Sequence, residues 1–337
     1  MGAEAASPSD PLDPVLEANA FLAEAAPAVW AALSPLGRRA LQPASFLPLQ
    51  TAEARGKAFN ATIGQITDGH GMAVPLPSMA AALSGLDEAE RSRAFLYSPV
   101  EGLPDLRRAW REWQRRGMGS EPASSLPLVT VGTAQARALA AELFAGKGRR
   151  VVLPVPCREG DRELFTLRLA AHPVPCDCVH GGHFDPAAIP RHLADLPDGE
   201  PAVVLLDFPR EETGYAPVTR ERAALCSALA REAEHRPLVV IVDDTWAGLG
   251  TPSASLFWGL AGRHPNLVPI KVDGADGQRG FAGGHVGFLT FPFEPDSGPA
   301  RALESKAKML LRAEVGSPPA MTQVLLLRAL RARLEST

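Results

Sequence analysis

The stretch from Leu238 to Phe291 constrains the fold most, because it reads as strand, acidic turn, helix, strand, glycine-rich loop and strand. Residues 238–242 are all leucine, valine or isoleucine, and Asp243 and Asp244 follow them directly. A short apolar run of this kind is typical of a parallel strand that is buried on both faces. The stretch therefore predicts two carboxylates at the carboxyl edge of a sheet, where open α/β sheets bind their ligands.

Other apolar runs at 128–131, 150–154 and 202–206 alternate with helical patterns between about 125 and 291. This alternation predicts an α/β fold with a mostly parallel sheet. Residues 219–236 form a charged amphipathic pattern, for which Thr219 is the expected N-cap.

Helices are also expected at both ends of the chain. They span 15–33, with a break at Pro27, then 300–314, and finally the segment from about 320 to Leu334.

Length and charge exclude several classes of protein. The chain has 337 residues, of which 46% are hydrophobic, and such a length predicts about two domains. Its net charge of −4 gives no basic surface for nucleic acid or anionic membranes, although residues 107–116 are rich in arginine. That segment is expected to be a helix with a solvated basic face and its two tryptophans turned inward. No apolar run is long enough to cross a membrane and no signal-peptide core is present, so we expect a cytoplasmic protein.

Four cysteines in a chain of this length do not form a disulfide scaffold. Cys176, Cys178, His180 and His183 lie close together in the sequence, but their spacing matches no common zinc module. We therefore expect a strand and a loop in this region and no metal.

Several segments resemble class I/II aminotransferases, which are fold-type I enzymes that depend on pyridoxal phosphate (PLP). Residues 243–249 read Asp-Asp-Thr-Trp-Ala-Gly-Leu, where the family has Asp-Asp-Ala-Tyr. Residues 271–277 read Lys-Val-Asp-Gly-Ala-Asp-Gly and residues 283–288 read Gly-Gly-His-Val-Gly-Phe. The family has Asp-Gly-Ala-Thr-Lys and Gly-x-Arg-x-Gly-Phe there. The resemblance extends from Ser34 to Leu330, and it implies a three-layer α/β/α PLP-transferase-like large domain with part of an N-terminal small domain.

The resemblance also implies a domain organisation. Residues 1–14 are expected to be a disordered tail, 15–75 the N-terminal segment of the small domain, and 76–314 the large domain. Residues 315–337 are expected to form a C-terminal helix, with the remainder of the small domain absent. Apolar surface on the N-terminal segment and on the helix containing 325–327 would then need a partner to cover it.

Some positions that contact the cofactor in the family are kept here. Tyr97 matches a tyrosine that reaches the cofactor phosphate of the dimer partner. Gly132, Thr133 and Ala134 match the phosphate cup, and a helix N-terminus suits an anion on physical grounds alone. Asp243 matches the aspartate that pairs with the pyridine nitrogen. An ordinary strand-to-helix connection explains residues 132–134 equally well, and an N-capping role explains Asp243.

Five other positions depart from the family pattern. Arg158 replaces an aromatic ring that stacks on the cofactor, and Glu211 replaces an asparagine that donates a hydrogen bond to its phenolate oxygen. Trp246 replaces a tyrosine, and the indole N–H remains a donor. His285 replaces an arginine that binds the phosphate. This replacement removes a charge-assisted hydrogen bond that contributes about 1.5–3 kcal/mol.

The fifth departure, Gly277, replaces the Schiff-base lysine, whose amine is both the covalent anchor and the general base. Lys271 is expected to be a strand-end charge, because six extended residues separate it from that position by about 20 Å.

These departures favour a pseudoenzyme that binds partners, as a homodimer or as a heterodimer with an active relative, with a small molecule as a further possible ligand. No cofactor is expected, or PLP only if it is held non-covalently. Two alternatives stay open: a repurposed enzyme without PLP that uses Asp243, Glu211 and His285 as acid and base groups, and a weak aminotransferase with non-covalent PLP.

Overall fold

The computed structural model describes residues 14–41, 47–57, 62, 66–68, 70–116, 122–181, 183–197, 199–248, 255–275 and 281–335. Residues 1–13 of the predicted tail (1–14) and the position of Gly277 lie outside these residues, whereas Pro14 opens the first helix and so does not belong to a tail. The chain divides into two compact units, 1–63 and 64–337. Each unit is described by itself.

The first unit contains short helices that begin at prolines or leucine. They are α1 (Pro14–Ala25), α2 (Pro27–Ala32), α3 (Pro35–Arg39) and α4 (Leu47–Glu53). The predicted break at Pro27 is confirmed, because the chain leaves the helix at Ala26 and Pro27 opens the next one. Leu16, Phe21 and Val29 are 58%, 68% and 52% exposed, so this segment carries the expected apolar surface.

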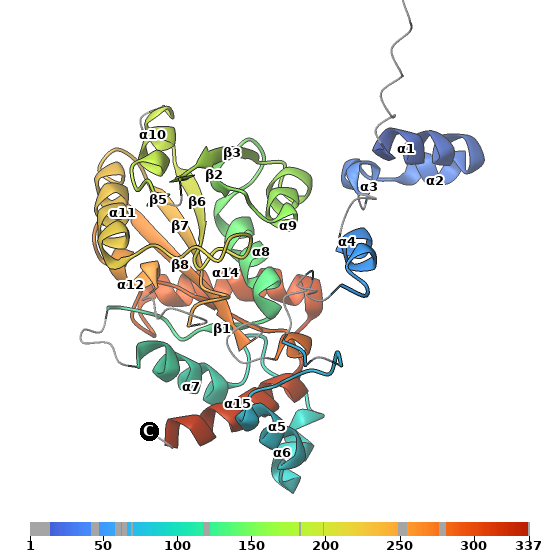
Figure 1. The fold of residues 1–337 in the computed structure, drawn as a ribbon, viewed down its shortest axis with the longest axis vertical. Helices are drawn as coiled ribbons and strands as arrows, with labels where there is room; N and C mark the ends of the chain where they lie inside the picture. Colours follow the sequence, from blue (N-terminus) through green and yellow to red (C-terminus); the bar gives the residue numbers. More distant parts are fainter. Residues whose placement is uncertain are drawn as a thin grey trace, which may run out of the picture. The chain divides into compact units, whose positions relative to one another are not determined.

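The second unit is built on a sheet in the order β1-β9-β8-β7-β6-β2-β3. Of these strands β9 alone runs opposite to the others, which confirms the predicted α/β fold with a mostly parallel sheet (Figure 1). The strands are β1 (Leu128–Val131), β2 (Arg150–Val155), β3 (His172–Asp177), β6 (Ala202–Asp207), β7 (Leu238–Asp243), β8 (Leu267–Gly274) and β9 (Val286–Thr290). A separate short hairpin pairs β4 (Val179–His180) with β5 (His183–Phe184).

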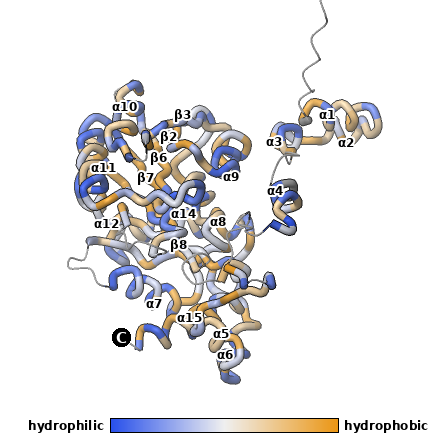
Figure 2. The backbone as a smooth tube through the Cα atoms, viewed as in Figure 1, coloured by the Kyte–Doolittle hydropathy of each residue, from blue (hydrophilic) through white to orange (hydrophobic). Residues whose placement is uncertain are grey.

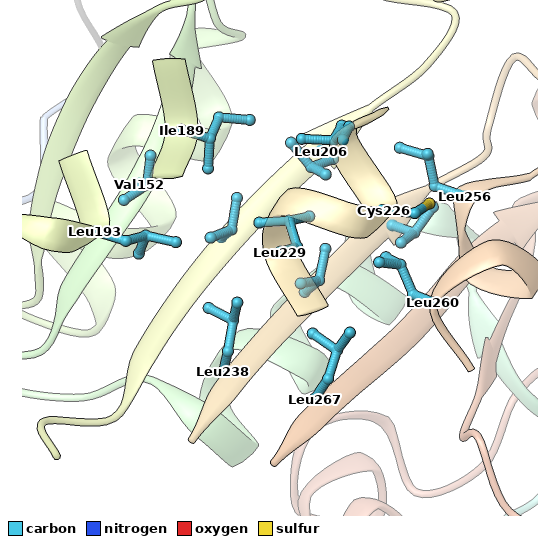
Figure 3. Close-up of a cluster of buried hydrophobic side chains, with 14 of the residues drawn as sticks. Val152, Ile189, Leu193, Leu206, Cys226, Leu229, Leu238, Leu256, Leu260 and Leu267 are labelled. Carbon is cyan, nitrogen blue, oxygen red and sulfur yellow. The ribbon is translucent and has the colours of Figure 1, made fainter. Parts of the chain in front are cut away.

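Alternate residues of the central strands face opposite sides of the sheet, as the period of two requires. One set packs under α10 (Ala188–Ala194), α11 (Thr219–Glu232) and α12 (Leu256–Leu260), as Figure 3 shows. Its strand residues include Val152, Val204, Leu206, Val240 and Val242. Burying each such side chain contributes about 1.5–3 kcal/mol.

The other set packs against α8 (Gly132–Phe144) and α14 (Gly298–Val315). Its strand residues include Val151, Leu153, Val203, Leu205 and Ile241. Asp207 and Asp243 continue this set by two residues each, so their side chains are directed toward the α8 side of the sheet. The carboxyl edge of the sheet therefore brings both carboxylates to the same face.

A further apolar cluster joins α5 (Pro77–Ser84), α6 (Glu88–Ala94), α7 (Pro104–Arg115) and α15 (Ala320–Glu335). Leu325, Leu326 and Leu327 are only 6%, 1% and 4% exposed. The expectation that this segment of α15 needs a partner to cover it is wrong, because this chain's own helices bury it. Within the described residues, no helix is both long and apolar enough to span a membrane.

Of two further predicted helices, α7 is as expected and α11 differs in its N-cap. Helix α7 has Pro104 in its first turn, and Trp110 is buried and stacks on Phe288 with ring centroids 4.1 Å apart, as the inward-facing pattern indicated. The N-cap of α11 is Val218 rather than Thr219. The reason is that the Glu221 carboxylate accepts a hydrogen bond from the Val218 backbone N–H at 2.9 Å, which satisfies that end of the helix.

Candidate active site

The carboxyl edge of the sheet assembles charged groups from four elements. Asp207 at the end of β6 is the register partner of Asp243 at the end of β7. The chain leaving β2 carries Arg158 into α9 (Glu159–Glu163), and α8 begins directly after β1. This is the part of an open α/β sheet at which ligands bind.

Helix α8 starts close against the sheet because two glycines allow it. Gly132 has a φ of +75°, which favours glycine. A Cβ at Gly287 on β9 would lie 2.3 Å from the carbonyl carbon of Gly132, so a side chain there would push the helix away. The close approach fixes where α8 begins. Arg137, in the next turn of the same helix, is thereby held in place.

Two arginines and two aspartates form a closed ring of ion pairs. The Asp243 Oδ2 atom lies 2.6 Å from Arg158 Nη2 and 2.8 Å from Arg137 Nη1. Asp161 closes the ring, with its carboxylate oxygens 2.8 Å from Arg158 Nε and 2.9 Å from Arg137 Nε. The Asp243 side chain is only 1% exposed, so the ring is a buried network whose charges balance.

The second oxygen of Asp243 is also engaged. Its Oδ1 atom accepts hydrogen bonds from the Thr245 backbone N–H at 2.9 Å and from the Thr245 hydroxyl at 2.5 Å. Burial alone would raise the pKa of Asp243, but the Arg158 and Arg137 cations and these hydrogen bonds hold it well below its usual range. Asp243 is thus a permanently charged acceptor, and Arg158 is its main cation.

Asp207 has the opposite electrostatic environment. Burial raises its pKa to about 7, although Arg210 and Arg158 act in the other direction, and the charge of Asp243 adds to the rise. Arg210 Nη1 lies 3.4 Å from Asp207 Oδ1. The same guanidinium donates to the backbone carbonyls of Pro154 and Pro156. Asp207 is therefore a group that titrates near neutral pH beside a carboxylate that does not.

Lys271 lies within β8, not at its end, and its amine is buried between two carboxylates. Its Nζ atom is 2.6 Å from Asp244 Oδ2 and 2.8 Å from Asp273 Oδ2. Burial acts to lower the pKa of Lys271, but the two carboxylates outweigh it and raise the pKa well above its usual value. Asp273 also accepts a hydrogen bond from Trp110 Nε1 at 3.1 Å. A charged, fully engaged ammonium of this kind is not a nucleophile.

The structure brings together some of the residues singled out in the sequence and leaves others apart. Glu211 joins the ring at its edge, with Oε2 3.2 Å from Arg158 Nη1. Trp246 follows the Asp243 turn, and its buried indole N–H has no hydrogen-bond partner among the described residues. Tyr97 is 95% exposed, and His285 is exposed in the left-handed backbone region with a φ of +44°.

The three residues at the start of α8 differ from one another. Gly132 and Thr133 are buried, whereas Ala134 is exposed. No side chain caps this helix end, and the Val131 backbone N–H before it donates to the Gln135 side chain at 2.8 Å. Their assignment as a phosphate cup stays a prediction.

Sequence reasoning missed Arg137, Asp161 and Thr245. The spacing of Arg158 and Asp161, three residues apart in an expected helical turn, could have suggested one of the ion pairs. An aspartate two residues before a threonine at a turn could have suggested the contact with Thr245. Nothing local marks Arg137 as a partner of Asp243, because 106 residues separate them.

The residues present do not fit covalently bound PLP. Where the resemblance places a pyridine nitrogen, Asp243 already has two guanidinium partners and a hydroxyl donor. Glu211 offers a carboxylate where a donor is expected, and Lys271 is held by its own ion pairs. The indole N–H of Trp246 is the contact that suits a bound acceptor.

The cysteine and histidine cluster has a plain structural role. Cys176 and Cys178 are buried in the apolar core below α10, and His180 and His183 are exposed on the β4–β5 hairpin. Within the described part of the chain, no group of three or more His, Cys, Asp or Glu side chains could hold a metal ion.

Removing one cation from the ring should destabilise the fold. We expect Arg158→Met to lower the free energy of unfolding by about 3 kcal/mol, because it leaves buried carboxylates short of a partner. The matched control is Arg162→Met on α9, the short helix that Arg158 precedes, where the Arg162 side chain is 62% exposed and 3.7 Å from Glu159. Its expected effect is below about 0.5 kcal/mol. Urea unfolding measures both, and equal effects would show that the ring contributes nothing special.

Asp207 should make the stability depend on pH. Its pKa is raised from 3.8 to about 7, so the protonated form favours the folded state below pH 3.8 and this contribution is lost as the pH rises through 7. We expect the free energy of unfolding of Asp207→Asn, relative to that of the wild-type chain, to rise by about 2–4 kcal/mol when the pH is raised from 4.5 to 8.

Urea unfolding at the two pH values tests this, with Asp185→Asn as the control. Arg191 and the backbone N–H of Ala187 lower the pKa of Asp185, so the difference between this variant and the wild type should stay nearly constant over the same range. Parallel pH profiles for the wild type and Asp207→Asn would contradict the assignment.

Comparison with known proteins agrees with the fold. The family model for aminotransferase class I and II matches residues 57–334. No curated protein matches the sequence.

Among solved structures, an aminotransferase from Anaerococcus prevotii DSM 20548 superposes with a TM-score of 0.76 at 16% identity, covering 90% of this chain and 77% of that one. YbdL from Escherichia coli, described with a methionine aminotransferase function, gives 0.65 at 16% identity, covering 88% and 74%. An aromatic-amino-acid aminotransferase from Burkholderia pseudomallei, covalently bound to pyridoxal phosphate, gives 0.67 at 19% identity, covering 90% and 77%. At these identities the structures establish a shared fold. Because the family model covers most of its length, the chain belongs to the class I and II aminotransferases.

Proposed function

We propose that this chain is a non-transaminating member of its family that acts by binding a partner. The observation that carries the proposal is the ion-pair ring. Asp243 keeps the position of the family's cofactor-pairing aspartate, but Arg158 and Arg137 neutralise its charge at 2.6 Å and 2.8 Å. A ligand nitrogen would have to displace a guanidinium from a buried carboxylate, at a cost of several kcal/mol.

The other residues that depart from the family pattern also support a chain that does not transaminate. Gly277 supplies no amine, and Lys271, the nearest alternative, is held between two carboxylates. His285 offers at most an imidazole where the family has a guanidinium. We assign residues 76–314 to the large domain, and 15–75 and 315–337 to parts of the small domain.

The two alternative functions have less support. In a repurposed acid–base site, Asp243 and Glu211 would work with His285. Both carboxylates share Arg158, and the structure describes no hydrogen bond or ion pair from His285 to either of them. Non-covalent PLP or another small molecule could use the Trp246 indole N–H and the uncapped start of α8. That alternative concerns binding and needs no catalytic lysine.

A second copy of this chain is the partner we favour. Phe95, Leu96 and Tyr97 follow one another in the connection between α6 and α7, and they are 83%, 63% and 95% exposed. Three consecutive large side chains at this level of exposure are typical of an interaction surface. Aromatic residues of this kind contribute most of the binding energy in many protein interfaces.

Reaction with PLP tests the loss of chemistry. After incubation with one equivalent of PLP, borohydride reduction and desalting, we expect no stoichiometric mass increase and no retained visible absorbance. We expect this because Arg158 forms an ion pair with the carboxylate of Asp243. The amine of Lys271 is likewise held in ion pairs, with Asp244 and Asp273. Intact-mass and peptide mass spectrometry measure the result. One PLP per chain on Lys271 would overturn the proposal, and PLP retained without attachment would favour the non-covalent alternative instead.

The Gly277→Lys variant is the matched control for this experiment. It restores an amine but leaves Arg158 on Asp243, so we expect its turnover of amino-acid donors to stay at least about a thousandfold below that of a typical enzyme. A coupled transaminase assay measures it. Clear turnover in this single variant would show that the other departures matter little.

Substitution of the exposed aromatic residues tests the dimer. We expect Phe95→Ser with Tyr97→Ser to raise the dimer dissociation constant at least about tenfold, because both rings leave the interface. Sedimentation velocity measures the constant, and Val218→Ser on the 58% exposed Val218 is the control. A wild-type chain that stays monomeric at tens of micromolar would contradict a homodimer.

A further inference from the structure

Helix α7 has two faces of opposite character. Its inner face buries Leu106, Ala109 and Trp110. Its outer face carries Arg108, Arg111, Glu112 and Arg115, at the i, i+3, i+4 and i+7 positions that lie on one side of a helix. Figure 2 shows hydrophilic and hydrophobic residues along this helix, which lies beside α15.

The outer face borders a pocket of about 420 Å³. Its lining residues are Arg108, Arg111, Glu112, Arg115, Arg116 and Leu126. This volume falls within the range of about 300–1000 Å³ that is usual for small-molecule sites. The outer face of this helix is solvated, as the sequence indicated, and it also forms one wall of a pocket.

The pocket has a strong excess of positive charge. Four guanidinium groups and one carboxylate line it, in a chain whose net charge is −4. Arg108 pairs with Asp105 at 2.5 Å, and Arg111 lies 3.6 Å from Glu294. Arg116 donates to the backbone carbonyls of Arg333 and Leu334, which carry no net charge.

The contacts described for Arg108 and Arg116 leave some of their own donors unused. Each guanidinium has five N–H groups. Arg108 and Arg116 are exposed, and the contacts described for them engage one nitrogen and two nitrogens respectively. Guanidinium forks match the geometry of phosphate and carboxylate oxygens.

We propose that this pocket binds a small elongated polyanion, of the chemical class that carries two or more linked phosphate groups. The backbone positions of the two exposed arginines, Arg108 and Arg116, are about 12 Å apart along the helix axis, since each residue adds about 1.5 Å. An anion with charge at both ends engages both of them, whereas a single phosphate reaches only one. The site lies outside the function proposed above and does not depend on it.

Titration of the full-length chain with inorganic tripolyphosphate tests the proposal, with calorimetry as the measurement. We expect a saturable isotherm at about 0.05 M salt that weakens at about 0.15 M, because the charges are partly exposed. Arg108→Gln with Arg116→Gln should raise the dissociation constant at least about tenfold. Inorganic phosphate should bind at least about tenfold more weakly than tripolyphosphate.

Two further variants separate a site from general electrostatics and from misfolding. Arg220→Gln with Arg222→Gln on α11 changes the net charge equally and should leave the dissociation constant unchanged. Glu112→Gln removes the pocket's carboxylate and should tighten binding about two- to fivefold, a gain that a damaged fold cannot produce. An absent isotherm, an equal loss in the α11 variant, or no gain from Glu112→Gln would each overturn the proposal.

Discussion

The pairing of Asp243 with Arg158 governs the rest of the carboxyl edge. A carboxylate that is 1% exposed at the end of a central strand requires a cation, because its desolvation would otherwise cost several kcal/mol. In the aminotransferases that this chain resembles, that cation belongs to the cofactor. Here it belongs to the chain, and Arg137 and Asp161 complete a neutral arrangement around it. Retention of the aspartate therefore needs no retained chemistry to explain it.

The fold itself could be predicted from the sequence because its signals are local. The apolar run at 238–242 forms β7 (Leu238–Asp243), and Pro27 separates α1 from α2. Strand runs and prolines act on their own neighbours, so their effect does not depend on distant contacts. The burial of residues 325–327 was not predictable in this way, because α5, α6 and α7, which cover them, come more than 200 residues earlier.

The site could be predicted only in part, for a related physical reason. Asp243, Arg158 and Glu211 could be singled out because the resemblance marks their positions, but the resemblance says nothing about which side chains of this chain they contact. Arg137 lies in an alanine-rich helix where an arginine ordinarily faces water. Only the tertiary fold, with α8 held against β9 at Gly287, turns that side chain toward the end of β7.

The ring also couples the proposed loss of transamination to the stability of the fold. Arg158 and Arg137 already balance Asp243 and Asp161, so a substitution that adds a lysine leaves both guanidinium contacts of Asp243 in place. Removing Arg158 first would leave buried carboxylates underpaired and would destabilise the fold before any cofactor could bind. Each single step is therefore unfavourable, because the favourable contacts require both changes together. Coupling of this kind would preserve the family fold together with a charge arrangement in which the chain's own arginines neutralise Asp243.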